Sequence, residues 1–213
     1  MTESETMRKP PMIGDSIALD LANTHFNVRK RLFDGIESEP ALASWLKDAG
    51  PRVTGGADTP DGVVNKNLVI RFHELRDVIR AAGARAADGL PPLAVEVEAL
   101  NAFARSIPSS PQLLPDDEGV WHLRAHADGA TPEVALAMIS ADMLTLLGGP
   151  RAQQLRACPA PNCPLFFLQD RPRRHWCSPA CGTRARAAAS YARHAQARTR
   201  PLHNPPRSVT PTT

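Results

Sequence analysis

The stretch CPAPNCPLFFLQDRPRRHWCSPACG holds every cysteine of this 213-residue chain. The cysteines form two close pairs, Cys158-x4-Cys163 and Cys177-x3-Cys181, with 13 residues between the pairs. Two such pairs can bring four thiolates to one tetrahedral zinc ion, and four protein ligands leave no coordination position open for water. We therefore predict one structural Zn²⁺, bound by Cys158, Cys163, Cys177 and Cys181.

The alternatives to a zinc site are a redox switch and a set of reduced cysteines without a shared ligand. A redox pair more usually has the spacing CxxC, which this chain lacks. A disulfide belongs to an oxidising compartment, and the N-terminal MTESETMRKPPMIGDS lacks the basic start and apolar stretch of a secretory signal. We expect a cytoplasmic protein with reduced cysteines.

The residues around the cysteines predict the elements that position them. Prolines favour a turn inside the first pair, and we expect a strand over 163–170, a turn over 171–174 and a return strand over 175–177. Ser178 and Pro179 are typical of an N-cap and a first helical residue. A turn, a hairpin and a helix in this order predict a treble-clef-like zinc finger.

These C-terminal residues resemble the CGNR zinc finger family. The resemblance is carried by the cysteine spacing, by Trp176-Cys177-Ser178, by Cys181-Gly182-Thr183-Arg184, and by the following Arg-Ala-rich segment with Tyr191, Arg193 and His194. Thr183 stands where the family has asparagine. In the front half, LDLANTH at residues 19–25 resembles the LDFxNT-type opening of the ABATE domain.

The CGNR finger usually lies at the C-terminus of bacterial proteins that begin with an ABATE domain, and these are described as stress-induced transcription regulators. The resemblance therefore implies a bacterial DNA-binding transcription regulator. It also implies that the front domain senses a small-molecule effector or mediates the formation of a homodimer.

The charge is divided unevenly along the chain. From Arg151 onward there are 11 arginines, no lysine and one acid, Asp170, for a net charge of +10, whereas residues 1–150 carry −7. Such a basic segment indicates a polyanionic partner, and arginine suits bidentate contacts with phosphates and guanine edges. The arginines that we predict to bind DNA are Arg171, Arg173, Arg174, Arg184, Arg186, Arg193 and Arg198.

Two other functions are compatible with this segment. In one, the basic zinc module binds an acidic partner and the protein is an interaction adaptor. In the other it is a nuclease, which needs a histidine base and ligands for a second metal. The segment offers His175, His194 and His203, with Asp170 as its single acid. We therefore predict that the protein is not an enzyme, and that His175 lies at the surface or beside the metal ligands.

The front half predicts a mainly helical α+β domain with few strands. Apolar residues at three- and four-residue spacing predict helices over 65–88 and 93–106. A third helix is expected from an N-cap at Thr131 to Leu147. Between them, QLLPDDEGVWHLRAHAD predicts two strands around an acidic turn.

Two shorter segments precede these helices. IALDLA follows Asp15 and favours a short helix, although its alternating apolar residues also suit a strand. ALASWLKDAG predicts a helix that ends at Gly50. The polar run Asp20, Asn23, Thr24 and His25 can line a ligand pocket, or it can form an Asx turn or cap a helix.

We predict four segments in the chain. They are a disordered N-terminus over 1–12, the ABATE-like domain over 13–150, the CGNR-like zinc finger over 151–200, and a disordered proline-rich tail over 201–213. No apolar run reaches the roughly 18 residues of a membrane span, so no membrane contact is expected.

Overall fold

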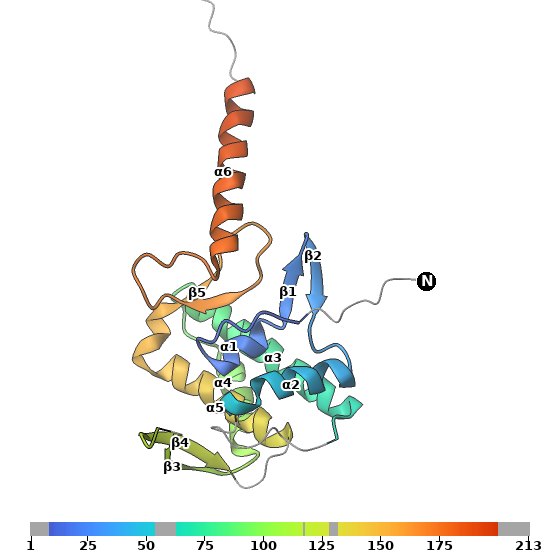
Figure 1. Cartoon of the computed structure of the whole chain (residues 1–213), viewed down its shortest axis with the longest axis vertical. Coiled ribbons are helices and arrows are strands. Elements are labelled where there is room, and N and C mark those ends of the chain that lie inside the picture. Colours follow the sequence, from blue (N-terminus) through green and yellow to red (C-terminus); the bar gives the residue numbers. More distant parts are fainter. Residues whose placement is uncertain (1–8, 54–62, 117, 128–131, 200–213) are drawn as a thin grey trace, which may run out of the picture.

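The computed structural model describes residues 9–53, 63–116, 118–127 and 132–199 of the chain. Helices dominate, and the described strands form three separate antiparallel hairpins. Figure 1 shows α1 to α5 gathered into one body, from which α6 extends away. The predicted class is confirmed, because the structure is mainly helical with few strands and ends in a small module around the four cysteines.

The described helices are α1 (Ile17–Ala22), α2 (Glu39–Val53), α3 (Lys66–Ala87), α4 (Ala94–Arg105), α5 (Pro132–Gly148) and α6 (Pro179–Thr199), with a short 3-10 helix, η1, at Pro150–Gln154. The described strands are β1 (His25–Val28), β2 (Arg31–Asp34), β3 (Ser109–Pro115), β4 (Trp121–Ala127), β5 (Leu155–Ala157) and β6 (Phe166–Leu168). None of the described helices is long and apolar enough to span a membrane.

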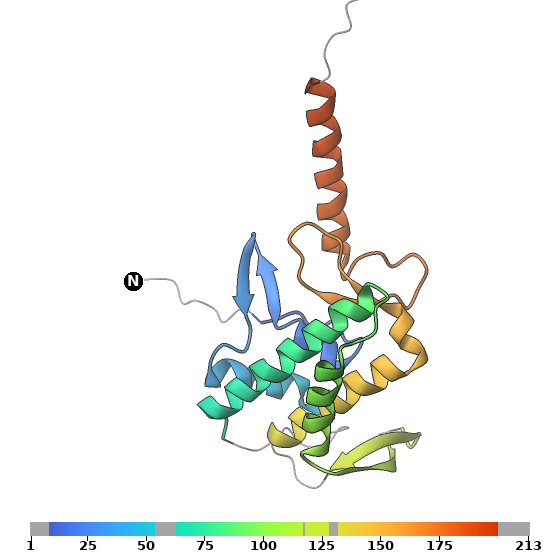
Figure 2. The same ribbon diagram turned by 180° about the vertical axis from the view of Figure 1, so that it is seen from behind.

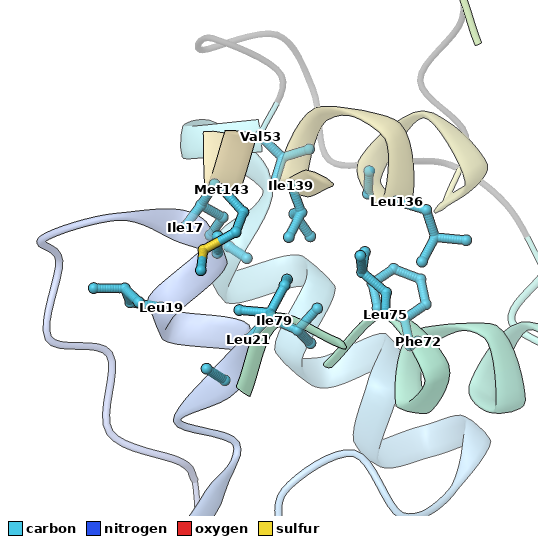
Figure 3. Close-up of a cluster of buried hydrophobic side chains, with 14 of the residues drawn as sticks. Ile17, Leu19, Leu21, Val53, Phe72, Leu75, Ile79, Leu136, Ile139 and Met143 are labelled. Carbon is cyan, nitrogen blue, oxygen red and sulfur yellow. The ribbon is translucent and has the colours of Figure 1, made fainter. Parts of the chain in front are cut away.

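The helices of the body pack around one hydrophobic core, part of which Figure 3 shows. From α3, Phe72, Leu75 and Ile79 are fully buried, at the spacing that predicted this helix. Ile139 and Met143 of α5 lie in the same core. The periodic pattern therefore identified the core face of α3 correctly.

The first helix, α1, begins where the sequence predicted, directly after Asp15 and Ser16. Ser16 is its N-cap, and the Ser16 hydroxyl accepts a hydrogen bond from Leu19 N at 3.4 Å. The same hydroxyl donates to Asp142 Oδ2 of α5 at 2.5 Å. Residues 17–22 are helical, so the alternative of a strand over this segment is wrong, and every residue of α1 is buried.

The second helix, α2, is longer than predicted. It was expected to end at Gly50, but it continues to Val53. Ala49 and Val53 are both buried in the core, and this packing outweighs the poor helix propensity of the glycine between them. The N-cap predicted at Thr131 lies outside the described residues, and the helix that follows it, α5, ends one residue beyond the predicted Leu147.

The hairpin formed by β1 and β2 was not predicted. Its strands pair in register around a turn of two residues, Arg29 and Lys30. The hairpin formed by β3 and β4 was predicted, and it pairs along its full length from Ser109 opposite Ala127 to Pro115 opposite Trp121. Figures 1 and 2 place the β3–β4 hairpin at the opposite end of the body from α6.

The third hairpin, β5–β6, lies in the main core as well as in the cysteine-bearing module. Leu155, Phe166 and Leu168 are buried in the same cluster as the core residues of α1, α3 and α5. The C-terminal module is therefore built onto the helical body.

Part of the segment predicted to be disordered lies against the body. Lys9 Nζ is 2.8 Å from Asp48 Oδ2 of α2, and Pro10 lies against Gly35. Residues 1–8 and the predicted tail at 201–213 lie outside the described residues.

Candidate metal centre and nucleic-acid interface

The first cysteine pair is held on a tight turn at the end of β5. Cys158 N donates to Leu165 O at 2.9 Å, and Cys163 N donates to Ala160 O at 3.0 Å. Asn162 has a φ of 57°, a left-handed conformation that asparagine tolerates better than most residues. These backbone bonds turn both thiols toward the same point.

One part of the predicted hairpin is wrong. The strand after the first pair exists as β6, but its partner is β5, which precedes Cys158, and the residues 175–177 form no strand. The hairpin therefore encloses the first cysteine pair, where the prediction had placed it between the two pairs. The treble-clef assignment itself stays a prediction.

The second pair lies at the start of α6, as predicted. The helix begins at Pro179, and Ser178 Oγ accepts a hydrogen bond from Cys181 N at 3.3 Å. Cys177 lies just before the helix and Cys181 in its first turn. The positive end of the helix dipole therefore lies beside the thiols and stabilises their ionised forms.

The four predicted ligands meet at one point, with their sulfur atoms within 4.8 Å of one another. Cys163 Sγ lies 3.7 Å from the Sγ atoms of Cys177 and Cys181, which are 3.4 Å apart. Zinc–sulfur bonds of about 2.3 Å require sulfur separations of about 3.8 Å in a tetrahedron. The geometry fits, and the four cysteines hold one structural zinc ion.

Four thiols at this separation cannot all ionise without a cation. Hydrogen bonds from Cys163 and Cys177 lower the pKa of Cys158 to about 2. The interaction with Cys158 raises the pKa of Cys163 to about 12, and it also raises the pKa of Cys177. A divalent cation removes this conflict, because it stabilises every thiolate that binds it. The donor set is therefore suited to a metal ion.

Side chains of α6 and of the loop before it surround the cysteines. Arg184 Nη2 donates to Cys181 Sγ at 3.1 Å, which offsets the negative charge of a zinc ion with four thiolates. The guanidinium of Arg186 lies over the Trp176 ring, 5.7 Å from its centroid. A Cβ at Gly182 would lie 3.0 Å from Trp176 Cε3, so glycine allows the indole to approach the first turn of α6. His175 is exposed and packs edge-on against Trp176.

The predicted DNA-binding arginines fall into two groups. Arg171 and Arg173 are exposed in the loop between β6 and α6. Arg174 points inward: its Nη1 donates to Asp15 Oδ1 and to Leu168 O, each at 2.9 Å. Its guanidinium also lies over the ring of Phe167. Arg174 therefore joins the loop to the helical body.

The remaining predicted arginines lie on α6. Arg184, Arg186 and Arg193 are exposed, on a helix that extends away from the body in both views (Figures 1 and 2). Arg198 is also within α6, but its side chain lies outside the described part of the structure.

Three of the four residues of the predicted ligand pocket are buried and bonded to protein groups. Asp20 Oδ1 accepts from Ile13 N at 2.8 Å, and Asp20 Oδ2 pairs with Arg52. Burial raises the pKa of Asp20, although the Arg52 charge opposes this effect. Asn23 is the C-cap of α1, which is the capping role that the sequence also allowed.

The other two residues of the run belong to a cluster of charged groups. Thr24 Oγ1 accepts from Arg76 Nη1 at 3.1 Å. Arg76 also binds both carboxylate oxygens of Asp34, at 2.5 and 2.8 Å, and His25 Nε2 lies 3.6 Å from Asp34 Oδ2. The run therefore anchors α1 and the base of the β1–β2 hairpin.

Two residues that connect the body to the zinc module were missed by the sequence analysis. Asp15 Oδ2 accepts from Leu168 N at 2.9 Å, in addition to its pairing with Arg174. Arg80 Nη1 donates to Ala22 O at 2.7 Å and to Pro164 O at 3.2 Å. No sequence pattern marks either residue, because their partners lie far away in the chain.

Comparison with protein families assigns both halves of the chain. Residues 15–150 match the model of the ABATE family, described as "Putative stress-induced transcription regulator". Residues 154–194 match the model of the CGNR zinc finger. The two matches adjoin the boundary predicted at residue 150. No curated protein matches the chain. The chain therefore belongs to the ABATE family and carries a CGNR zinc finger after its ABATE domain.

Proposed function

We propose that this protein is a transcription regulator that binds DNA through its zinc finger. The observation that carries the proposal is the length of α6 that no other described element covers. From Arg186 to His194 every described side chain is exposed except the partly covered Ser190. Most of the stability of a helix in a protein comes from packing against other elements. Within the described residues this part of α6 has no such packing, so its surface is available for a macromolecular partner.

The side chains of α6 are arranged by type around the helix. Arg186 and Arg193 are seven residues apart and share one face. Ala185, Ala188 and Ala192 share another face, which Arg184 borders. The major groove of DNA admits an α-helix, and arginines on its surface can reach guanine edges or phosphates. We assign this contact to Arg186 and Arg193, because the guanidinium of Arg184 is bound to Cys181 Sγ.

A hollow beside the start of α6 supports the same proposal. It has a volume of about 540 Å³ and is lined by Asp170, Arg171, Arg173, Arg174, His175, Trp176, Cys177, Ser178 and Pro179. A phosphate here would lie near two exposed arginines and the positive end of α6. We assign contacts with DNA phosphates to Arg171 and Arg173. Arg174 is left out because its guanidinium is held by Asp15.

For the ABATE domain we propose the sensing of a small polar molecule, with no catalytic step. The proposal is supported by a pocket of about 540 Å³ between the starts of α2 and α3, lined by Glu37, Ser38, Glu39, Pro40, Lys66, Val69, Ile70 and His73. Acidic and basic groups over an apolar floor suit a small polar ligand. Such a ligand would raise the melting temperature and, if it is an effector, change the DNA affinity.

The DNA-binding proposal is tested by fluorescence anisotropy with labelled duplex DNA and three forms of the protein. These are the wild type, Arg186→Gln/Arg193→Gln on α6, and a control, Lys47→Gln/Arg105→Gln, that removes the same charge from α2 and α4. The logarithm of the binding constant falls linearly with the logarithm of the salt concentration, and we call the steepness of this fall the salt slope. Each lost phosphate contact reduces the salt slope by about 0.9. The α6 variant should bind about tenfold or more weakly, and the control like the wild type. Equal binding by all three overturns the assignment of α6.

The adaptor hypothesis makes a different prediction for the same experiment. The wild type would then bind no duplex DNA even at low salt, while an acidic protein would still bind the basic module.

A further inference from the structure

The turn of the β1–β2 hairpin has an unusual composition. Arg29 and Lys30 are its two turn residues, with φ values of 49° and 69°. Two-residue turns with both φ values positive strongly prefer Asn-Gly, because other residues are strained there. Arginine and lysine at these positions cost stability, and such strain tends to be kept where it serves a function.

The turn forms the centre of a small basic tip, which we define as Arg29, Lys30 and Arg31. All three side chains are exposed. The guanidinium of Arg31 lies 5.4 Å from the centroid of the Phe33 ring. Within the described part of the chain, none of the three forms a salt bridge. Three adjacent cations without a carboxylate partner create a local positive potential that attracts anions.

The basic tip is held at a fixed place relative to the zinc module. Phe26 of β1 is buried in the cluster that contains Cys158, Cys177 and Cys181. Asn27 Nδ2 donates to Asn162 O, in the turn between the first two cysteines, at 2.6 Å. The hairpin therefore cannot move away from the zinc site without breaking these contacts.

The tip and α6 extend from the same end of the molecule. Figure 1 shows the β1–β2 hairpin rising beside the base of α6, and the view from behind in Figure 2 shows the same arrangement. The end of the molecule that presents the basic helix therefore also presents the basic tip, from the other domain of the chain.

We infer that the β1–β2 tip is a second nucleic-acid contact, in which Arg29, Lys30 and Arg31 bind backbone phosphates of the duplex that α6 engages. The inference rests on the proposed function. Phosphates on the two sides of a groove form a regular anionic surface, and a basic tip beside a groove-bound helix is placed to reach it. The ABATE domain would then contribute directly to DNA affinity.

The test uses the full-length, zinc-loaded variant Arg29→Asn/Lys30→Gly. This substitution removes two charges and places the preferred residues in the turn, so the hairpin is retained. A melting temperature at or above that of the wild type checks the fold. Fluorescence anisotropy with duplex DNA over a range of salt concentrations should give a salt slope that is smaller than that of the wild type by about 1.8. Near 0.1 M salt the variant should bind at least about tenfold more weakly. The control Lys47→Gln/Arg105→Gln should match the wild type.

Two results overturn the inference, and they are distinguishable. If the wild type binds DNA and Arg29→Asn/Lys30→Gly binds with the same affinity and slope, the tip makes no contact while the proposed function stands. If the wild type binds no DNA, the proposed function fails and the inference fails with it. Arg31→Gln is an independent second variant, and its slope should fall by about 0.9.

Discussion

Asn23 and Phe166, which are 143 residues apart in the sequence, are joined by two hydrogen bonds. Asn23 Nδ2 donates to Phe166 O at 3.0 Å, and Phe166 N donates to Asn23 Oδ1 at 2.8 Å. Both residues are buried. The end of α1 is thus bonded to β6, which makes the ABATE domain and the zinc finger one packed unit.

Replacement of Asn23 should destabilise the whole chain. Asn23→Ala leaves the buried N–H and C=O of Phe166 without partners, so we expect the free energy of unfolding to fall by about 3 kcal/mol. Asn27→Ala is the control, because it removes one exposed hydrogen bond, to Asn162, and should cost about 1 kcal/mol or less. Urea unfolding measures both. Equal losses for the two variants would contradict the role given to Asn23.

Zinc removal should loosen the ABATE domain as well as the finger. Phe26 of β1 and Phe167 of β6 pack in one cluster with Cys158, Cys177 and Cys181. A zinc-selective chelator should therefore lower the melting temperature by about 10 °C, which corresponds to about 3 kcal/mol at this size. Hydrogen exchange should quicken in β1 and β2, and a calcium-selective chelator should have no effect. If hydrogen exchange became faster only within residues 155–199, the ABATE domain and the zinc finger would be independent of each other.

Gly182 should be intolerant of a side chain. In Gly182→Ala the new Cβ would lie 3.0 Å from Trp176 Cε3 and 3.3 Å from Trp176 Cδ2, so the indole must shift. Gly148 at the end of α5 has nothing within 4 Å of such a Cβ, which makes Gly148→Ala the matched control. We expect Gly182→Ala to be less stable than Gly148→Ala by about 2 kcal/mol. Equal stabilities in chemical denaturation would contradict this packing.

Stability should fall in mild acid because of His25. Burial lowers the pKa of His25 below its ordinary value of 6.5, and the charge of Arg76 adds to this effect while Asp34 opposes it. The unfolded chain therefore takes up this proton first as the pH falls. The contribution of His25 to stability is complete above about pH 6.5 and is lost as the pH falls through the folded pKa.

The variant His25→Gln should remove that part of the pH dependence. The free energy of unfolding, measured from pH 8 down to pH 5, should have a smaller slope below about pH 6.5 in the variant. Identical slopes for the variant and the wild type would show that His25 is not the titrating group.

The parts of the fold that could be predicted are those governed by local patterns. The apolar stripe of α3 recurs from Leu68 to Ala82, and the cysteine pairs have ligand spacing that few other sites share. The start of α6 at Pro179 follows from capping chemistry alone. These features depend on residues close together in the chain, so the sequence was sufficient for them.

The features that were missed depend on contacts across the chain. The β1–β2 turn contains Arg29 and Lys30, so no turn-forming dipeptide marks the hairpin. The partner of β6 was misassigned because pairing with β5 becomes visible only when Leu155 and Leu168 are seen in the core. The inward orientation of Arg174 likewise depends on Asp15, which is 159 residues away.

We propose that the zinc module holds α6 in a form that binds DNA. The most direct test is fluorescence anisotropy of labelled random-sequence duplex DNA with the zinc-loaded protein, over a range of salt concentrations, before and after zinc is removed. We expect binding that weakens steeply with salt and is lost with the metal. Binding that survives zinc removal unchanged, or no binding at low salt with zinc present, would contradict it.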